Sequence, residues 1–176
     1  MIRVCVDTNA ERVELFLNGS LLQTKQSEED CYAVSFEVPF TPGELRAVAV
    51  RGAETVEDAL ATPSALAEVR LSTVQTALEE KDGTEIIQVE VSLHDRVGRP
   101  IVSRDEMLHF ALAGNGEIMG IDNGAPDDLT PYSSRKRATF MGRLVVYVRP
   151  GEEKGPSALY VTAPGGVTAN VGLFCE

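Results

Sequence analysis

Four oxygen-bearing side chains cluster in one short segment of the sequence, and they are Asp122, Asn123, Asp127 and Asp128. Carboxylate and amide oxygens suit a hard cation such as calcium, which takes about six to eight oxygen ligands. The spacing differs from that of a helix-flanked calcium loop. The alternative is a tight turn over 122–124, in which side-chain oxygens accept backbone N–H groups and the glycine takes a positive φ. We favour the turn and keep this segment as the first place to test for an ion.

Tyr132 extends this candidate loop and suggests a second kind of chemistry, the binding of carbohydrate. Sugar platforms use flat exposed aromatic rings, because an apolar sugar face stacks on them. The chain has no Trp, four Tyr and six Phe. Tyr132 is the one aromatic residue that we expect to be exposed; strand patterns place Phe16, Phe36, Phe40 and Phe110 in a core. A single tyrosine is a poor platform, which argues against autonomous glycan binding.

The remaining polar groups give no complete catalytic or metal site. His94 and His109 stand apart from any defensible partner set, at a strand end and on the polar side of a strand respectively. The run 135–137, Arg-Lys-Arg, is interpreted as solvated, with docking to another acidic domain as the alternative. We therefore predict no catalytic residue, no metal ligand set and no cofactor.

Charge and hydropathy exclude two classes of partner. Sixteen basic and 27 acidic side chains give a formal net charge of −11. Such a surface repels phosphate backbones and anionic lipids, so neither nucleic acid nor membrane is an expected partner. No apolar run approaches the ~20 residues of a membrane span, and no charged-then-apolar leader opens the chain. The compartment stays open, because an exported parent would carry its signal upstream of Met1.

Three cysteines occur without metal-ligand spacing: Cys5, Cys31 and Cys175. A disulfide between Cys5 and Cys31 is conceivable but does not follow from sequence. Buried free thiols are the interpretation that we favour.

Period-two alternation of apolar residues runs from end to end and predicts an all-β chain. Clear examples are 13–17, 32–40, 87–93, 108–112, 144–148, 159–163 and 167–171. Asn18-Gly19 between apolar residues predicts a hairpin, because both residues tolerate positive φ. Turn signals recur at about the 8–12 residue spacing of a β-sandwich. Helical periodicity is poor everywhere.

Small residues and a proline in 59–65 mark a domain boundary near Pro63. We therefore predict two tandem immunoglobulin-like antiparallel β-sandwiches, one over 1–63 and one over 64–176. The sequence lacks tryptophan, so the buried tryptophan of antibody domains is absent.

The first module resembles a known enzyme accessory domain. The segments that carry the likeness are 13–21 (VELFLNGSL) and 38–49 (VPFTPGELRAVA). They are similar to the small β-sandwich that follows the catalytic barrel in many bacterial glycoside hydrolase family 2 enzymes, which are β-galactosidases and related exo-glycosidases. One departure is the segment 23–25 (Gln-Thr-Lys), because the family usually has a glycine after the leucine that corresponds to Leu22.

The second module is similar to the immunoglobulin-like C-terminal domain of the same enzymes. The matching segments are 91–102, 114–124 and 137–144, and the most distinctive of them is Asp122-Asn123-Gly124 followed by Phe140-Met141-Gly142. The order of the two modules is what indicates the family. In such enzymes the two catalytic glutamates lie on a barrel that this chain lacks, so the resemblance implies membership of a glycosidase and transfers no catalytic residue.

Neighbouring carboxylates do not change this interpretation. Retaining glycosidases place two carboxyl groups about 5–5.5 Å apart beside a sugar-sized cleft. The adjacent pairs here lie in predicted turns and are interpreted as solvated loop charges; they occur at 28–30, 79–80, 127–128 and 152–153.

Two hypotheses for the function of the chain follow from these observations. The first is an accessory region that packs on the catalytic barrel of the parent enzyme or mediates contact with a second subunit. The second is an immunoglobulin-like adhesin segment or a carbohydrate-binding module, which rests on the generic Asp-x-x-Gly strand pattern and on Tyr132.

Overall fold

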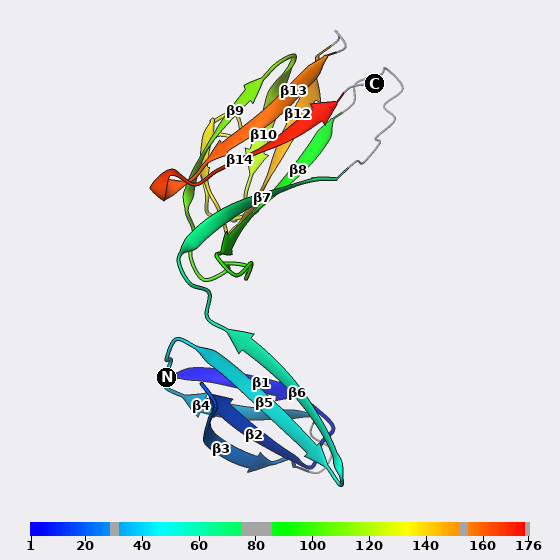
Figure 1. Cartoon of the computed structure of the whole chain (residues 1–176), viewed down its shortest axis with the longest axis vertical. Helices are drawn as coiled ribbons and strands as arrows, with labels where there is room; N and C mark the ends of the chain where they lie inside the picture. Colours follow the sequence, from blue (N-terminus) through cyan, green and yellow to red (C-terminus); the bar gives the residue numbers. More distant parts are fainter. Residues whose placement is uncertain (29–31, 75–85, 152–154, 175–176) are drawn as a thin grey trace. The chain divides into compact units, whose positions relative to one another are not determined.

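The computed structural model describes residues 1–28, 32–74, 86–151 and 155–174. These residues form an all-β structure of antiparallel strands with one short 3₁₀ turn at Pro164–Gly166 (Figure 1). Two compact units divide the chain, Met1–Thr62 and Pro63–Glu176. None of the described residues forms a helix long and apolar enough to cross a membrane.

The first unit contains β1 to β6, and its strands form one two-stranded and one four-stranded sheet. The strands are β1 (Ile2–Asp7), β2 (Arg12–Leu17), β3 (Ser20–Gln26), β4 (Ala33–Val38), β5 (Glu44–Arg51) and β6 (Glu54–Ala61). The small sheet is β1-β4 and the large sheet is β3-β2-β5-β6. Val13, Leu15, Val34, Phe36 and Val38 form the buried core between them.

The β2–β3 hairpin shows how a local signal sets a strand pair. Asn18 and Gly19 form its turn, both at positive φ (50° and 81°). A two-residue turn of this kind matches the right-handed twist of the flanking strands. The predicted hairpin is therefore confirmed, and it sets the pairing of Leu17 with Ser20.

The second unit contains β7 to β14 in two four-stranded sheets. Its strands are β7 (Leu66–Val74), β8 (Ile87–Asp95), β9 (Met107–Ala113), β10 (Gly116–Asp122), β11 (Lys136–Ala138), β12 (Arg143–Pro150), β13 (Pro156–Thr162) and β14 (Thr168–Phe174). The sheet orders are β10-β12-β8-β7 and β11-β9-β13-β14.

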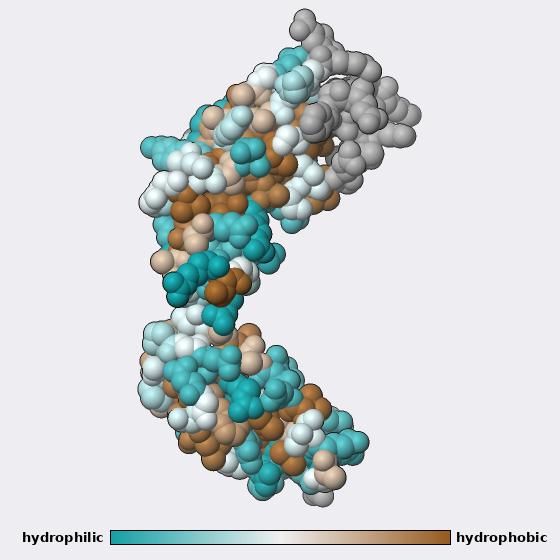
Figure 2. All heavy atoms as spheres, in the orientation of Figure 1, coloured by the Kyte–Doolittle hydropathy of each residue, from teal (hydrophilic) through white to brown (hydrophobic). Residues whose placement is uncertain are grey.

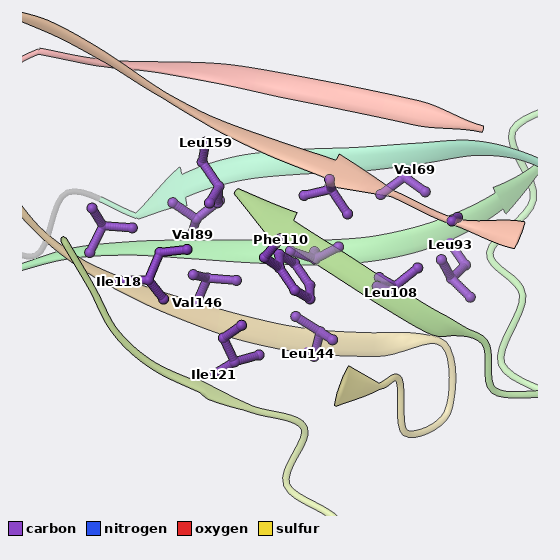
Figure 3. Close-up of a cluster of buried hydrophobic side chains, with 14 of the residues drawn as sticks. Val69, Val89, Leu93, Leu108, Phe110, Ile118, Ile121, Leu144, Val146 and Leu159 are labelled. Atoms are coloured by element: carbon purple, nitrogen blue, oxygen red, sulfur yellow. The ribbon is translucent and has the colours of Figure 1, made fainter. Parts of the chain in front are cut away.

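The inward faces of these sheets build a single core (Figure 3). Each strand contributes alternate residues, as the period-two pattern requires. Val89 and Val146 face it from one sheet and Leu108 and Leu159 from the other, each at most 1% exposed. The surface of both units is mixed, with apolar residues scattered among polar ones on the face that Figure 2 shows.

Both units are immunoglobulin-like, and the strands of the smaller first unit have counterparts in the second. In the second unit, β7, β8, β12 and β10 correspond to strands A, B, E and D of an immunoglobulin sandwich, and β9, β13 and β14 to C, F and G. In the first unit, β1-β4 corresponds to B-E and β3-β2-β5-β6 to an edge strand followed by C, F and G. The described part of the first unit contains no counterpart of strands A and D.

Several aromatic side chains depart from the sequence-based assignment. Phe40 was expected in the core but is 61% exposed, because β4 ends at Val38 and Pro39 cannot continue the ladder. Phe16 lies on the outer face of β2, half-buried under the Arg46 guanidinium at 4.6 Å. Tyr32 is 72% exposed, so Tyr132 is not the one exposed aromatic. Cys5 is a free thiol but is exposed, so the buried thiol that we favoured is wrong for this residue; Cys31 and Cys175 lie outside the described residues.

Separate cores predict separate unfolding. Phe36 is fully buried in the first unit, and Phe36→Ala should cost about 3–5 kcal/mol. That is most of the stability of a unit this small, at roughly 0.05–0.15 kcal/mol per residue. Calorimetry should show loss of the first unit's transition with the second unchanged. The matched variant Leu159→Ala should lower only the second unit's transition; a common shift of both would contradict independence.

Candidate functional site

The candidate loop between β10 and β11 is held by a buried arginine, Arg137. Its side chain is 2% exposed, and Nε donates to Asp128 Oδ2 at 2.9 Å. The two terminal nitrogens donate to the backbone carbonyls of Ile121 and Thr130. One guanidinium thus connects the end of β10, the middle of the loop and the start of β11.

Asp128 is engaged on both of its oxygens. Oδ1 accepts the backbone N–H of Thr130 at 2.8 Å, and Oδ2 also accepts Asn123 Nδ2 at 2.9 Å. Hydrogen bonds from the side chain and backbone of Thr130, with those from Arg137, lower the pKa of Asp128 to about 2, against the raising effect of burial. The carboxylate is therefore ionised and turned toward N–H donors.

Asp122 and Asn123 form the turn that we favoured from sequence. Asp122 Oδ1 accepts the Gly124 N–H at 3.1 Å, and Asn123 Oδ1 accepts the Ala125 N–H at 3.0 Å. Gly124 has a φ of 72°, a conformation that a glycine adopts without a Cβ clash. Asp127 is exposed. Across the described residues, no three His, Cys, Asp or Glu side chains converge as a metal group; ion binding by this loop stays a prediction.

Tyr132 is 63% exposed, in agreement with the sequence. The Arg137 guanidinium lies 5.0 Å from the centre of its ring, a cation–π distance. The Tyr132 carbonyl accepts the Ile121 N–H at 2.9 Å, which ties the loop to β10. The ring is therefore held in place while one part of it faces solvent.

A groove of about 370 Å³ adjoins the loop on the outer face of the sheet β10-β12-β8-β7. Its lining includes the polar side chains Ser72, Glu90, Ser92, Asp122, Asn123 and Arg143, with Tyr147, beside the apolar residues Val91, Leu144 and Val145. The structure thus brings Asp122 and Asn123 to this groove, whereas Asp128 belongs to the Arg137 network. Tyr132 is not among the lining residues. Hydroxyl, carboxylate and guanidinium groups in an open groove can hydrogen-bond a polyol.

Arg137 is the residue that sequence reasoning missed. The basic run was interpreted as solvated, which holds for Arg135 and Lys136 but is wrong for Arg137. Arg137 and Thr139 are both 2% exposed and alternate with exposed or half-buried neighbours. A period-two pattern in which polar residues occupy the inward positions was the available signal.

A second buried carboxylate, Asp95, closes the turn after β8. It is 1% exposed and accepts the N–H groups of Ser64 at 3.0 Å, Val97 at 3.0 Å and Arg99 at 2.9 Å. These hydrogen bonds lower the pKa of Asp95, with the Ser64 N–H as the largest cause. Asp95 therefore fastens the first residues of the second unit to its sandwich.

His94 lies beside this turn and does have partners. Its Nε2 is 2.9 Å from Ser92 Oγ, and its Nδ1 is 3.1 Å from the Gly98 carbonyl. The tautomer with a proton on Nδ1 satisfies both contacts. The partner on Nδ1 is a backbone carbonyl and not a carboxylate, and we assign the histidine a structural role at the end of β8.

The site thus belongs to a β-sandwich whose loops are held by buried charged residues. Known proteins show to which family this sandwich belongs. The profile of the glycoside hydrolase family 2 C-terminal domain 5 matches residues 69–172. The chain belongs to glycoside hydrolase family 2. Residues 1–57 of this family 2 chain match a domain of unknown function, DUF4982.

Known relatives match nearly the whole chain in sequence and in structure. A β-galactosidase of Bacteroides ovatus, BoGH2A, is 31% identical over 92% of this chain, which corresponds to 19% of the relative. A solved family 2 member from Bacteroides cellulosilyticus superposes with a TM-score of 0.82 at 26% identity, covering 99% of this chain and 23% of its own. A β-glycosidase from Bacteroides vulgatus superposes with a TM-score of 0.72 at 28% identity, and the match covers 99% of this chain and 22% of the β-glycosidase. The chain spans about a fifth of these proteins' length, and the adhesin alternative is not favoured.

Acid should destabilise the second unit, in part because Asp128 becomes protonated. Its folded pKa of about 2 lies below the ordinary 3.8. Its stabilisation is therefore complete above pH 4 and is lost as pH falls toward 2. Asp128→Asn should lower the urea midpoint of the second unit at pH 7 and flatten its decline between pH 4 and 2. The exposed neighbour provides the control, Asp127→Asn, which should keep the wild-type slope; equal slopes in all three proteins would contradict the assignment.

Proposed function

We propose that this chain is the non-catalytic C-terminal region of a larger family 2 glycosidase. Residues 1–63 are the module that follows the catalytic barrel, and residues 64–176 are the C-terminal immunoglobulin-like module. The observation that carries this is the match of both modules, in order, to relatives of which the chain spans about a fifth. Its role is to pack against the barrel and support it, with contact to a second subunit as a further part of the same proposal.

The chemistry of the described residues favours a structural role over a catalytic one. Their most strongly organised carboxylates, Asp95 and Asp128, accept several N–H groups each and serve as structural acceptors. A glycosidase acid must present a carboxyl to the glycosidic oxygen. Carboxylates that are committed to backbone N–H groups and to a buried guanidinium cannot do so without breaking the loop that they hold.

Activity and stability measurements separate this role from catalysis. The purified chain should fold and should not hydrolyse nitrophenyl β-galactoside or β-glucuronide. The parent enzyme truncated before residue 1 should retain barrel chemistry in its folded fraction but inactivate faster on heating. Turnover by the purified fragment, lost on mutation of one of its own residues, would remove the proposal.

The outer-face groove supports carbohydrate contact as a second candidate. The polar side chains in its lining and the half-exposed Tyr147 are suited to a sugar hydroxyl and ring face. In NMR titrations with oligosaccharides of the parent's substrate, shifts should map to β8 and β12 and disappear in Arg143→Ala. If the shifts disappear in Tyr132→Ala but persist in Arg143→Ala, the contact lies at the loop instead. If no shift occurs at any of these residues, this candidate is discarded.

A further inference from the structure

The two-stranded sheet of the first unit has one edge covered and one edge open. At the β4 edge, the Ser35 carbonyl accepts Lys25 Nζ at 2.6 Å and the Glu37 carbonyl accepts Gln23 Nε2 at 3.4 Å. Two side chains of β3 thus occupy outward acceptors of β4. Covering an edge in this way prevents another strand from pairing there.

The other edge, along β1, is open. Thr8 donates its N–H to the Tyr32 carbonyl at 2.9 Å, just beyond the β1–β4 ladder. Because hydrogen-bonded pairs alternate in an antiparallel ladder, the backbone groups of Arg3, Cys5 and Asp7 point away from β4. Within the described residues, β4 is the only strand that pairs with β1. The outward groups therefore form an unused pairing edge.

The sheet opposite this edge exposes two large apolar side chains on its inner face. Leu45 and Ala49 of β5 pack against the core, and their cross-strand partners on β6 are Leu60 and Val56. Residues opposite each other on neighbouring strands share a face of the sheet. Leu60 and Val56 thus lie on the inner face, yet they are 73% and 72% exposed. The two-stranded sheet is too narrow to cover β6.

A groove marks the uncovered space. It has a volume of about 350 Å³ and lies between the end of β1, the inner face of β5 and the inner face of β6. Val6, Ala10, Ala47, Val56 and Asp58 are among its lining residues. The groove therefore adjoins the Asp7 end of the edge whose backbone groups are unpaired.

The second unit, which is also immunoglobulin-like, fills this position with a strand of its own. There β7 pairs with the outer edge of β8, the counterpart of β1, and packs against β14, the counterpart of β6. Val69 of β7 is 4% exposed and Leu173 of β14 is 2% exposed. A strand in this place covers in one unit what is left exposed in the other.

We propose that the open β1 edge and its groove hold an extended strand of the parent polypeptide. The strand is the segment directly before residue 1, because β7 likewise precedes β8, and it runs antiparallel to β1. Backbone hydrogen bonds supply the pairing, and alternate apolar side chains cover Val56 and Leu60. Asp58 lies between them, so the facing position suits a polar or basic residue. This inference rests on the proposed function only in taking the strand from a longer parent chain.

The test extends the chain at its amino end by the native residues that precede it. About 12–15 residues are enough for a strand and a tight turn. Hydrogen exchange at the amides of Arg3, Cys5 and Asp7 should slow at least ~10-fold, because they become ladder donors. The thermal midpoint of the first unit should rise. An extension of equal length made of Gly and Ser should leave both unchanged.

Paired variants locate the effect in the groove. Val56→Asp and Leu60→Asp should barely change the unextended chain, where both side chains face solvent, but should cancel the protection in the extended chain. Leu21→Asp, at a position 55% exposed on the β3 edge, is the matched control and should do neither. Equal behaviour of native and Gly-Ser extensions, or of Leu21 and Val56 variants, would overturn the proposal.

Concentration dependence separates the parent strand from a second copy of the chain. Protection of the same amides that rises with concentration in the unextended chain would show pairing between copies and would overturn the assignment to the parent strand. No glycosidase activity is measured in this test. A negative result therefore leaves the proposed supporting role standing, and failure of that role would leave the strand result unaffected.

Discussion

Each sheet in this chain has one apolar face, and the structure depends on covering that face with another sheet. The hydrophobic driving force is about 25 cal/mol per Å² of apolar surface removed from water, so the gain depends on how completely the faces overlap. In the second unit four strands face four, and the inward residues of both sheets are buried. In the first unit two strands face four, and the inner face of β6 remains exposed. The same fold is thus closed in one unit and open on one side in the other.

Closing the second sandwich creates a problem for the long connection between β10 and β11. This connection joins edge strands of the two sheets, and the buried polar groups beside it must find partners. Arg137 supplies three donors in a planar fork to Asp128 and to two carbonyls. A buried ion pair is costly to desolvate, and here further hydrogen bonds from Thr130 and Asn123 to Asp128 offset that cost. The network fixes a loop; it does not present a reactive carboxylate.

This division of labour fits an accessory region of a family 2 enzyme. The charged residues that are most strongly engaged hold turns, at Asp95 and at Asp128, and the polar groups left for a ligand line a shallow outer groove. In the first unit, Val56 and Leu60 of β6 expose apolar surface beside the groove at the end of β1. The proposed packing against other parts of a larger protein is consistent with this distribution.

The sequence by itself determined the strands, the hairpin at Asn18-Gly19 and the family, because alternation, turn chemistry and motif order are local properties. It also gave the turn at Asp122-Asn123-Gly124, whose hydrogen bonds lie within two residues. Only the tertiary structure decided that Arg137 is buried, that Phe40 is exposed and that Asp95 binds Ser64. Those outcomes depend on which strands become neighbours and where each ladder ends. Such pairings join residues far apart in the chain, and a local period-two pattern does not say which of its two faces turns inward.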